Sequence, residues 1–381
     1  MSESATGNLW QETPLIYSSR FSESLGSSVY LKLENLHPSH SFKYRGISHF
    51  IKKAKQQHGP SVHIVIASGG NAGLAAACAS HTLGVECSVF IPEGVSPSTL
   101  DILRREKAKV IVIGQHYSEA LVAARDLVDR EPEAVMVPAY DDPIVWEGHS
   151  SMVTEICNQL SRKPDAIFCS VGGGGLLGGI IVGCKREGWD DVPLVAIETI
   201  GSDCFYHSIS LNGGRFNSVT KMLPPGVDLI HDKENNVFLA HFNSFSSKAS
   251  GSLGASQPAA GVAKMALERK GDLKSISVPD ELSMEALAMF ANDHKLLVEL
   301  ACSTTLVPAY HPSLFEKLVK PEGERKRIVV FIVCGGFKVS VEEAAEYMRI
   351  LQEVPSGPEE YWNVKGDNGE LLEVPKDEAR S

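Results

Sequence analysis

One lysine and two glycine-rich segments carry the residues best suited to chemistry in this chain. Lys43 lies in the segment Ser41-Phe42-Lys43, and a lysine amine can bond covalently to an aldehyde. Residues 68–73, Ser-Gly-Gly-Asn-Ala-Gly, combine backbone amides with small polar side chains that can bind a carboxylate. Residues 172–175 are four glycines, whose amides can wrap a phosphate where a helix begins. Together these segments predict a phosphate-bearing aldehyde cofactor and a substrate with a carboxylate.

Each segment also has a plainer interpretation. A lysine is commonly a solvated surface charge, a run of four glycines can be a flexible connector, and Ser68 or Asn71 can cap a helix. A dinucleotide site is a further alternative for the glycines, since Glu198 lies roughly twenty residues downstream. Such a site normally opens the fold, whereas these glycines follow the apolar run 166–171 in the middle of the chain.

Short β-branched runs alternate with helical patterns along most of the chain. The expected strands are 62–67, 87–91, 110–113, 166–171, 194–198 and 328–334. The expected helices among the first of them are 71–83, 98–106 and 117–129. This alternation predicts parallel strands joined by helical crossovers, with ligands bound at the carboxyl ends of the strands.

Composition narrows the classes of function. With 381 residues and 43% hydrophobic residues, the chain can form two domains or one large α/β unit. A formal net charge of −11 disfavours nucleic acid and acidic membranes as partners. The eight cysteines lack the short paired spacings of zinc sites, and residues 1–7 lack the features of a signal peptide. No apolar run is long enough to cross a bilayer, so we expect a cytoplasmic protein with reduced thiols and a small-molecule substrate.

In the order of these motifs, the chain resembles the serine/threonine dehydratases of the fold-type II, tryptophan synthase β-like, pyridoxal phosphate family. It is most similar to the eukaryotic cytosolic L-serine dehydratases. The segments that carry the resemblance are 13–15, 29–34, 41–46, 68–73, 141–143, 146–149, 172–177, 298–302 and 333–336.

The resemblance implies an α/β fold of two open, twisted, mostly parallel sheets flanked by helices. A large cofactor-binding domain would comprise residues 1–43 and 148–352, and a small domain would comprise residues 44–147. Residues 353–381 would be an acidic C-terminal tail, and the sequence leaves open whether this tail docks. The resemblance also implies a homodimer.

Individual residues acquire roles from the same resemblance. Lys43 would be the catalytic residue and would also hold pyridoxal 5'-phosphate. The other cofactor-binding residues would be Phe42, Asn71, Gly172, Gly173, Gly174, Gly175, Leu176, Cys334 and Gly335. An amino-acid substrate would be bound by Ser41, Ser68, Gly69, Gly70, Asn71, Ala72 and Tyr140. A monovalent cation such as K⁺ would be bound by Glu198, Ser202, Leu253 and Ala255, with a plain surface role for Glu198 as the equal alternative.

The activity implied is β-elimination from L-serine or L-threonine, which gives a 2-oxo acid and ammonia. Related racemases have a serine at the position of Gly69, and a glycine cannot transfer a proton, so racemisation is disfavoured. Cys334, in place of an aspartate near the pyridine nitrogen, favours loss of a β-substituent. The alternatives are β-elimination or β-replacement on a different β-substituted amino acid, and a non-catalytic binder of the same fold.

Two features depart from the family pattern. His40, Ser303, Phe337 and Lys338 stand where the family commonly has other residues, and we expect these four positions to reshape the substrate pocket. Lys338 could meet an additional substrate carboxylate. Residues 212–250 are rich in Asn, Ser, Gly and charge, and they predict a surface excursion.

Overall fold

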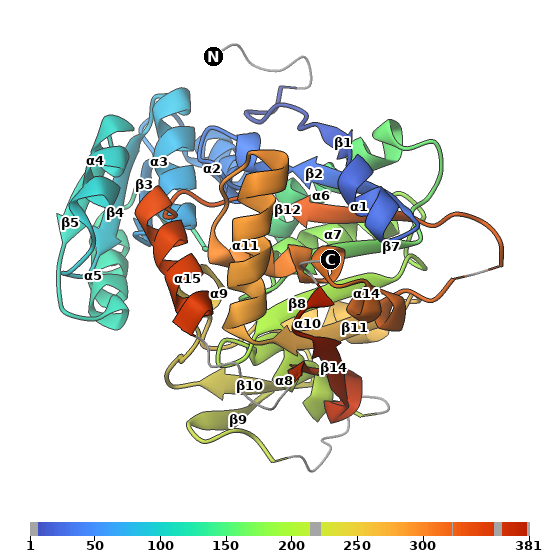
Figure 1. Cartoon of the computed structure of the whole chain (residues 1–381). Coiled ribbons are helices and arrows are strands. Elements are labelled where there is room, and N and C mark those ends of the chain that lie inside the picture. The colour runs from blue at the N-terminus through green and yellow to red at the C-terminus, as the bar shows by residue number, and fades with distance from the viewer. Residues whose placement is uncertain (1–6, 214–221, 322, 354–359, 379–381) are drawn as a thin grey trace.

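The computed structural model describes residues 7–213, 222–321, 323–353 and 360–378, and their strands form two open sheets and a separate hairpin (Figure 1). In spatial order the large sheet contains β1 (Leu15–Tyr17), β2 (Ser28–Leu33), β12 (Ile328–Val333), β7 (Ala166–Ser170), β8 (Leu194–Thr199), β11 (Leu273–Val278), β13 (Tyr361–Lys365) and β14 (Leu371–Pro375). The small sheet contains β5 (Lys109–Val112), β4 (Glu86–Ile91), β3 (His63–Ala67) and β6 (Ala134–Met136).

Helices flank both sheets. Those between residues 19 and 159 are α1 (Ser19–Ser24), α2 (Lys43–His58), α3 (Asn71–Leu83), α4 (Pro97–Arg105), α5 (Tyr117–Arg130) and α6 (Pro143–Gln159). Those that follow are α7 (Gly175–Arg186), α8 (Cys204–Leu211), α9 (Ser250–Leu253), α10 (Ala260–Glu268), α11 (Asp280–His294), α12 (Leu300–Ser303), α13 (Val307–Tyr310), α14 (Pro312–Leu318) and α15 (Val341–Glu353). Short 3₁₀ turns span Glu34–Leu36, Thr304–Leu306 and Asp367–Gly369. None of the helices within the described ranges is both long and apolar enough to span a bilayer.

Parallel pairing dominates both sheets. All pairs in the small sheet are parallel, and so are the pairs that join β2, β12, β7, β8 and β11. Among the described residues, the antiparallel pairs of the large sheet lie at its edges, at β1 and at β13–β14. The predicted α/β architecture of two mostly parallel sheets is therefore confirmed.

Burial explains why the strand predictions succeed. All six residues of β12, Ile-Val-Val-Phe-Ile-Val, are buried, as are all five residues of β7. Helices cover both faces of a parallel sheet, so its strands are continuously apolar rather than alternating. The expected helix 71–83 coincides with α3, and the other expected elements shift by no more than one residue at either end.

Helices α2 and α6 form the connection between the two sheets. They approach closely because glycines face each other: a Cβ on Gly148 would lie 2.7 Å from the Cα of Gly46 and 2.8 Å from the carbonyl oxygen of Arg45. In Figure 1, α3, α4 and α5 lie around the small sheet on one side of the molecule. The residue that begins α2, Lys43, therefore lies at the junction of the two sheets.

The predicted excursion at 212–250 contains an antiparallel hairpin of β9 (Val227–Asp232) and β10 (Val237–Phe242), at the lower edge of Figure 1. Most of β9 is exposed, whereas Val237, Leu239 and Ala240 of β10 are fully buried. The excursion thus has one surface strand and one strand that contributes to a core. Residues 214–221 lie outside the described residues.

The C-terminal segment is docked where the structure describes it. Strand β13 pairs with β11 at Lys365 and Ser277, and the β13–β14 hairpin ends the large sheet. Val364 and Val374 are fully buried, and the Tyr206 hydroxyl donates to the carbonyl of Gly366 at 3.0 Å. Residues 354–359 and 379–381 of the predicted tail lie outside the described residues.

Candidate active site

A cavity of about 950 Å³ lies at the carboxyl ends of strands from both sheets. It adjoins the segments that directly follow β3, β7 and β12. Residues on its wall include 41–43, 67–72, 139–140, 170–176, 251–256, 299, 301, 334–335 and 337–340. The structure therefore brings together the lysine motif, both glycine-rich segments and the Cys334 motif, as parallel-sheet topology favours.

Backbone hydrogen bonds hold the lysine motif against the Cys334 motif. The amide of Phe42 donates to the carbonyl of Cys334 at 3.0 Å, and Ser41 and Gly335 form an antiparallel bridge. The amide of Gly336 donates to the carbonyl of His40 at 2.7 Å. Two segments almost three hundred residues apart in sequence thus form one wall, from which Lys43 extends.

Lys43 has the electrostatics of a reactive amine. Burial lowers its pKa to about 8, although Cys334 and Glu299 act in the opposite direction. Its Nζ donates to the carbonyl of Ala139 at 3.2 Å. A lowered pKa increases the neutral fraction near neutral pH, and only the neutral amine can attack a carbonyl or accept a proton.

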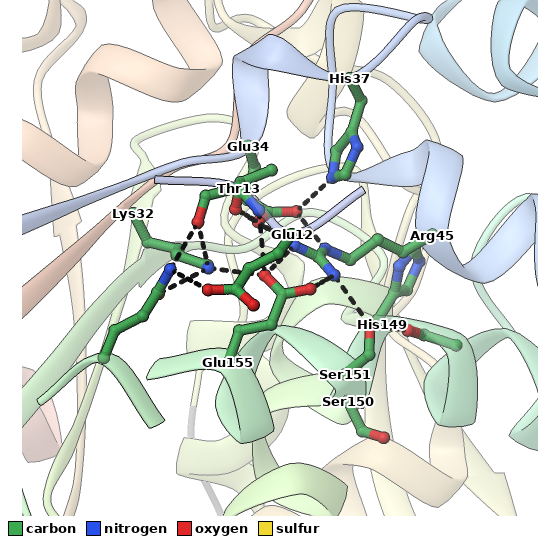
Figure 2. A network of polar contacts seen from close by, with 12 residues as sticks. Glu12, Thr13, Lys32, Glu34, His37, Arg45, His149, Ser150, Ser151 and Glu155 are labelled. Carbon is green, nitrogen blue, oxygen red and sulfur yellow. Dashed lines mark hydrogen bonds and ion pairs between the residues drawn. The ribbon is translucent and has the colours of Figure 1, made fainter. Parts of the chain in front are cut away.

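A buried network of charges anchors the helix that begins with Lys43 (Figure 2). Arg45 donates through Nε to Glu34 at 2.7 Å and through Nη1 to Glu155 at 2.6 Å. Lys32 donates to Glu155 at 2.6 Å and to the carbonyl of Thr13 at 2.8 Å. Burial alone would raise the pKa of Glu34, but Arg45 holds it well below its usual range. These two cations and two carboxylates compensate one another and fix α2 to β2 and α6.

The glycine segment 172–175 follows β7 and opens α7. Gly174 caps this helix with a left-handed backbone (φ 91°), which favours glycine. A Cβ on Gly173 would lie 2.5 Å from the ring of Tyr140, and one on Gly175 would lie 3.0 Å from the Tyr140 Cβ. The space beside these backbones is therefore filled. The first amides of α7 have no partner within the helix and can bind an anion.

The second loop, residues 68–72, follows β3 and opens α3. The amide of Gly70 donates to Ser68 Oγ at 3.3 Å. Asn71 is buried and connects this loop to the other side of the cavity, because its Oδ1 accepts from the amide of Phe337 at 3.1 Å. Its Nδ2 donates to both carboxylate oxygens of Glu299, at 3.0 and 3.1 Å.

Glu299 is a charged residue of this site for which the sequence alone predicts no role. It lines the cavity, is 5% exposed and accepts hydrogen bonds from Ser252 Oγ at 2.5 Å and from the amide of Lys338 at 3.0 Å. A signal existed, since Glu299 is the one charge in the apolar run 296–302. A lone charge in such a run requires buried partners.

The segment that follows β12 places the thiol of Cys334 at the cavity wall, with a second thiol, that of Cys302, behind it. Cys334 lines the cavity, and its Sγ lies 3.6 Å from Ser170 Oγ. The amide of Gly335 donates to the Sγ of Cys302 at 3.2 Å. Gly335 has φ 82°, and a Cβ there would lie 2.3 Å from the carbonyl oxygen of His40. Only glycine fits this turn.

Two of the four departures from the family pattern line the cavity, namely Phe337 and Lys338. His40 and Ser303 are not among its lining residues, so the expectation that they shape the pocket is corrected. His40 adopts a left-handed backbone (φ 58°) in the turn before Ser41. Ser303 is buried and donates to the carbonyls of Ser283 and Leu300, at 2.7 and 2.9 Å, so its role is in helix packing.

The four residues predicted to bind a cation differ in whether they line the cavity. Leu253 and Ala255 line the cavity, whereas Glu198 and Ser202 are not among its lining residues. Glu198 is fully buried and accepts from the amides of Phe205 at 3.0 Å and of Tyr206 at 2.5 Å. Burial and then the neighbouring Asp203 raise its pKa well above the usual range. Within the described ranges, no cluster of three or more His, Cys, Asp or Glu side chains could hold a metal.

The arrangement fits a phosphate-bearing aldehyde. It provides a buried amine at Lys43, a helix N-terminus whose glycines leave no room for a Cβ, and an unsatisfied hydroxyl on the wall. That hydroxyl is Ser41 Oγ, which is buried and has no hydrogen-bond partner in the part of the chain that the structure describes.

Comparison with known proteins agrees with this chemistry. The family model described as "Pyridoxal-phosphate dependent enzyme" matches residues 8–335. The chain is 35% identical to the L-serine dehydratase/L-threonine deaminase of Homo sapiens, over 90% of this chain and 94% of that protein. It is 32% identical to the L-serine dehydratase of Saccharomyces cerevisiae, over 88% and 95%.

A solved structure shares the fold. A fungal L-serine ammonia-lyase from Rhizomucor miehei superposes with a TM-score of 0.76 and 30% identity, covering 89% of this chain and 98% of that one. Threonine deaminase isoform 2 from Solanum lycopersicum has a TM-score of 0.73 at 19% identity, which supports the fold alone. Because the family model covers most of the chain and the relatives match it nearly end to end, this chain belongs to the pyridoxal-phosphate dependent enzyme family, in the branch that the L-serine dehydratases share.

Proposed function

We propose that this protein is a pyridoxal phosphate-dependent ammonia-lyase that acts on L-serine or L-threonine. The single observation that carries the proposal is the convergence of the Lys43 amine and both glycine-rich segments on one cavity. The names of the relatives, L-serine dehydratase and L-threonine deaminase, support the substrate class. With L-serine, the net reaction gives one pyruvate and one ammonium ion, because the water lost in the elimination returns when the nitrogen is hydrolysed.

Different residues of the chain would bind the cofactor, bind the substrate and transfer the proton. Pyridoxal phosphate, when bound, would supply an electron sink for the α carbon of the substrate. Lys43 would hold this cofactor and, after the substrate amine takes its place, would remove the α proton. The first amides of α7 would hold the phosphate, and the amides at the start of α3 would hold the substrate carboxylate. Asn71, fixed by Glu299 and Phe337, would orient the substrate-side loop.

We further propose elimination rather than racemisation. Gly69 has no side chain that could deliver a proton to the substrate. A Cβ at this position would lie 3.1 Å from Ile91 Cγ2, so a side chain there would require Ile91 to move. Release of 2-oxo acid without formation of D-serine is the expected result.

The test is a substrate screen of the purified protein loaded with pyridoxal phosphate. L-serine and L-threonine should release 2-oxo acid and ammonia in equal amounts, and Lys43→Ala should not. Absence of ammonia would favour a non-catalytic binder. If an added thiol diverts serine from pyruvate into a thioether amino acid, β-replacement is the better description.

A K⁺ requirement, a homodimer and a cytoplasmic location are finer parts of the proposal. Ser202 Oγ is buried without a partner among the described residues, in the segment that follows the strand of Glu198, and this supports a cation there. Replacing K⁺ by a bulky organic cation should lower activity if the site is used. Sedimentation of the holoenzyme and fractionation of cells would test the other two parts.

A further inference from the structure

The segment after β12 crosses from the large sheet to the small one. Gly335 and Gly336 have φ of 82° and 137°, and these turns direct the chain across the cavity. The amide of Phe337 donates to Asn71 Oδ1 at 3.1 Å, and its side chain packs against the core of the small sheet. The amide of Lys338 donates to Glu299 at 3.0 Å. The position of Lys338 is therefore fixed by contacts from both sides.

The Lys338 ammonium lies over the loop at 68–72. Its Nζ donates to the carbonyl of Gly251 at 3.1 Å, and a Cβ on Gly70 would lie 3.2 Å from this Nζ. The side chain is exposed and lines the cavity. An ammonium has three donors, so others remain for a ligand besides the one that reaches Gly251.

No negatively charged side chain of the cavity is paired with this ammonium among the described residues. Among the described residues that line it, the charged side chains are Lys43, Glu299 and Lys338. Glu299 accepts from Asn71, from Ser252 and from the amide of Lys338. Under the proposed function Lys43 serves the cofactor, and the amides at the start of α3 serve the substrate's α-carboxylate. Lys338 is then a cation that neither the cofactor nor the α-carboxylate of the substrate requires.

We propose that Lys338 is a specificity-determining residue that binds a second carboxylate, so that the enzyme accepts amino acids with a β-hydroxyl and a carboxylate on the same carbon. This inference rests on the proposed function. The simplest such substrate is L-3-hydroxyaspartate, which loses ammonia to give oxaloacetate. Water leaves across the α and β carbons and is regained on hydrolysis, so no oxidant is required.

The experiment compares kcat/KM of the holoenzyme for L-serine and for both diastereomers of L-3-hydroxyaspartate. A charged hydrogen bond corresponds to about tenfold or more in kcat/KM. Lys338→Met should therefore lower the value for the diacid about tenfold more than the value for serine, and Lys338→Arg should retain part of the preference. The matched control is Lys270→Met, an exposed lysine away from the cavity, which should change neither value.

A binding measurement provides a readout that does not depend on turnover. L-aspartate and L-alanine lack a β-hydroxyl, so their binding to the holoenzyme can be followed by visible absorbance, and Lys338→Met should weaken aspartate selectively. Equal losses for mono- and dicarboxylates would overturn the inference, because Lys338 would then bind the α-carboxylate. A natural enzyme that turns over serine but never the diacid also overturns it. Turnover of neither substrate would instead refute the proposed function.

Discussion

The two glycine-rich loops occupy equivalent places in the two sheets, yet they are built differently. Each follows a buried parallel strand and opens a helix: residues 68–72 lead from β3 into α3, and residues 172–175 lead from β7 into α7. The loop of the large sheet has no side chains of its own, and Tyr140 packs against its backbone. The loop of the small sheet carries Ser68 and Asn71, and Asn71 contacts Glu299 across the cavity.

Under the proposed function, this difference matches two kinds of ligand. A phosphate is the same in every catalytic cycle, so a rigid set of amides at a helix start suits it. A substrate enters and leaves in each cycle, and side chains that bridge the cavity can respond to it. The loop at 172–175 should therefore tolerate no added volume. The loop at 68–72 should be sensitive to changes in charge and hydrogen bonding.

The largest effect is expected at the residue that both loops face. Lys43→Ala removes the amine that would bond the cofactor and move the α proton, so activity should fall at least about 10³-fold. Borohydride treatment of the natural holoenzyme should attach the cofactor to the peptide that contains Lys43, as peptide mass spectrometry would establish. Lys53→Ala, in the same helix but away from the cavity, is the control and should remain active. Attachment to any other lysine contradicts the assignment.

The backbone character of the large-sheet loop can be tested by adding volume. Gly173→Val would clash with Tyr140 and should reduce cofactor affinity about tenfold or more, since overpacking costs about 1–3 kcal/mol. Gly183→Ala is the matched control in the following helix, where the new Cβ would lie 2.6 Å from Val153 and away from the cavity. It should lower the melting temperature without changing cofactor affinity, which fluorescence titration of the apoprotein measures. Equal effects of both variants on affinity would favour a merely structural glycine segment.

The side-chain character of the small-sheet loop can be tested by adding charge. Asn71→Asp would place a carboxylate against Glu299, where an amide donates at 3.0 Å. Loss of that hydrogen bond is worth about 1.5–3 kcal/mol, so kcat/KM should fall about 10- to 100-fold. Adding Glu299→Gln to this variant should recover part of the loss because the repulsion disappears. Strictly additive losses in the double variant would show that the two residues act independently.

The smallest effect concerns the pH at which the amine between the loops becomes reactive. Its pKa of about 8 lies below the ordinary lysine value because burial disfavours the charged form. Attachment of the cofactor to the apoprotein should therefore speed up as the pH rises through about 8 and level off above it. From pH 7 to the plateau the rate should rise about tenfold, in proportion to the neutral amine. A rate that still climbs steeply above pH 9 would indicate an exposed, ordinary lysine.

Local sequence patterns were sufficient for the central strands of both sheets, for helices α3, α4 and α5, and for most of the residues that line the candidate site. Apolar β-branched runs predict β3, β4, β7, β8 and β12, and the glycines that follow β3 and β7 mark the starts of helices. These signals act over a few residues, so they can be read without knowing what packs nearby. The family of the chain could also be recognised from the order of the motifs.

Long-range packing decided the remainder. Nothing near Glu299 in sequence indicates that its carboxylate meets Asn71, 228 positions away. Likewise, His40 and Ser303 looked like pocket residues because they neighbour site motifs, but a neighbour in sequence can point away from a cavity.

The sequence by itself determined the α/β fold, the Ser-Phe-Lys motif at Lys43 and the two helix-opening glycine loops, because the spacing of apolar residues and the chemistry of turns are local properties. Only the tertiary structure decided that β13 and β14 complete the large sheet, that Glu299 and Asn71 join the two sides of the cavity, and that Lys338 stands over the loop at 68–72. The physical reason is that the burial and the hydrogen-bond partners of an isolated polar residue depend on which distant segments pack against it. No single stretch of the chain contains that information.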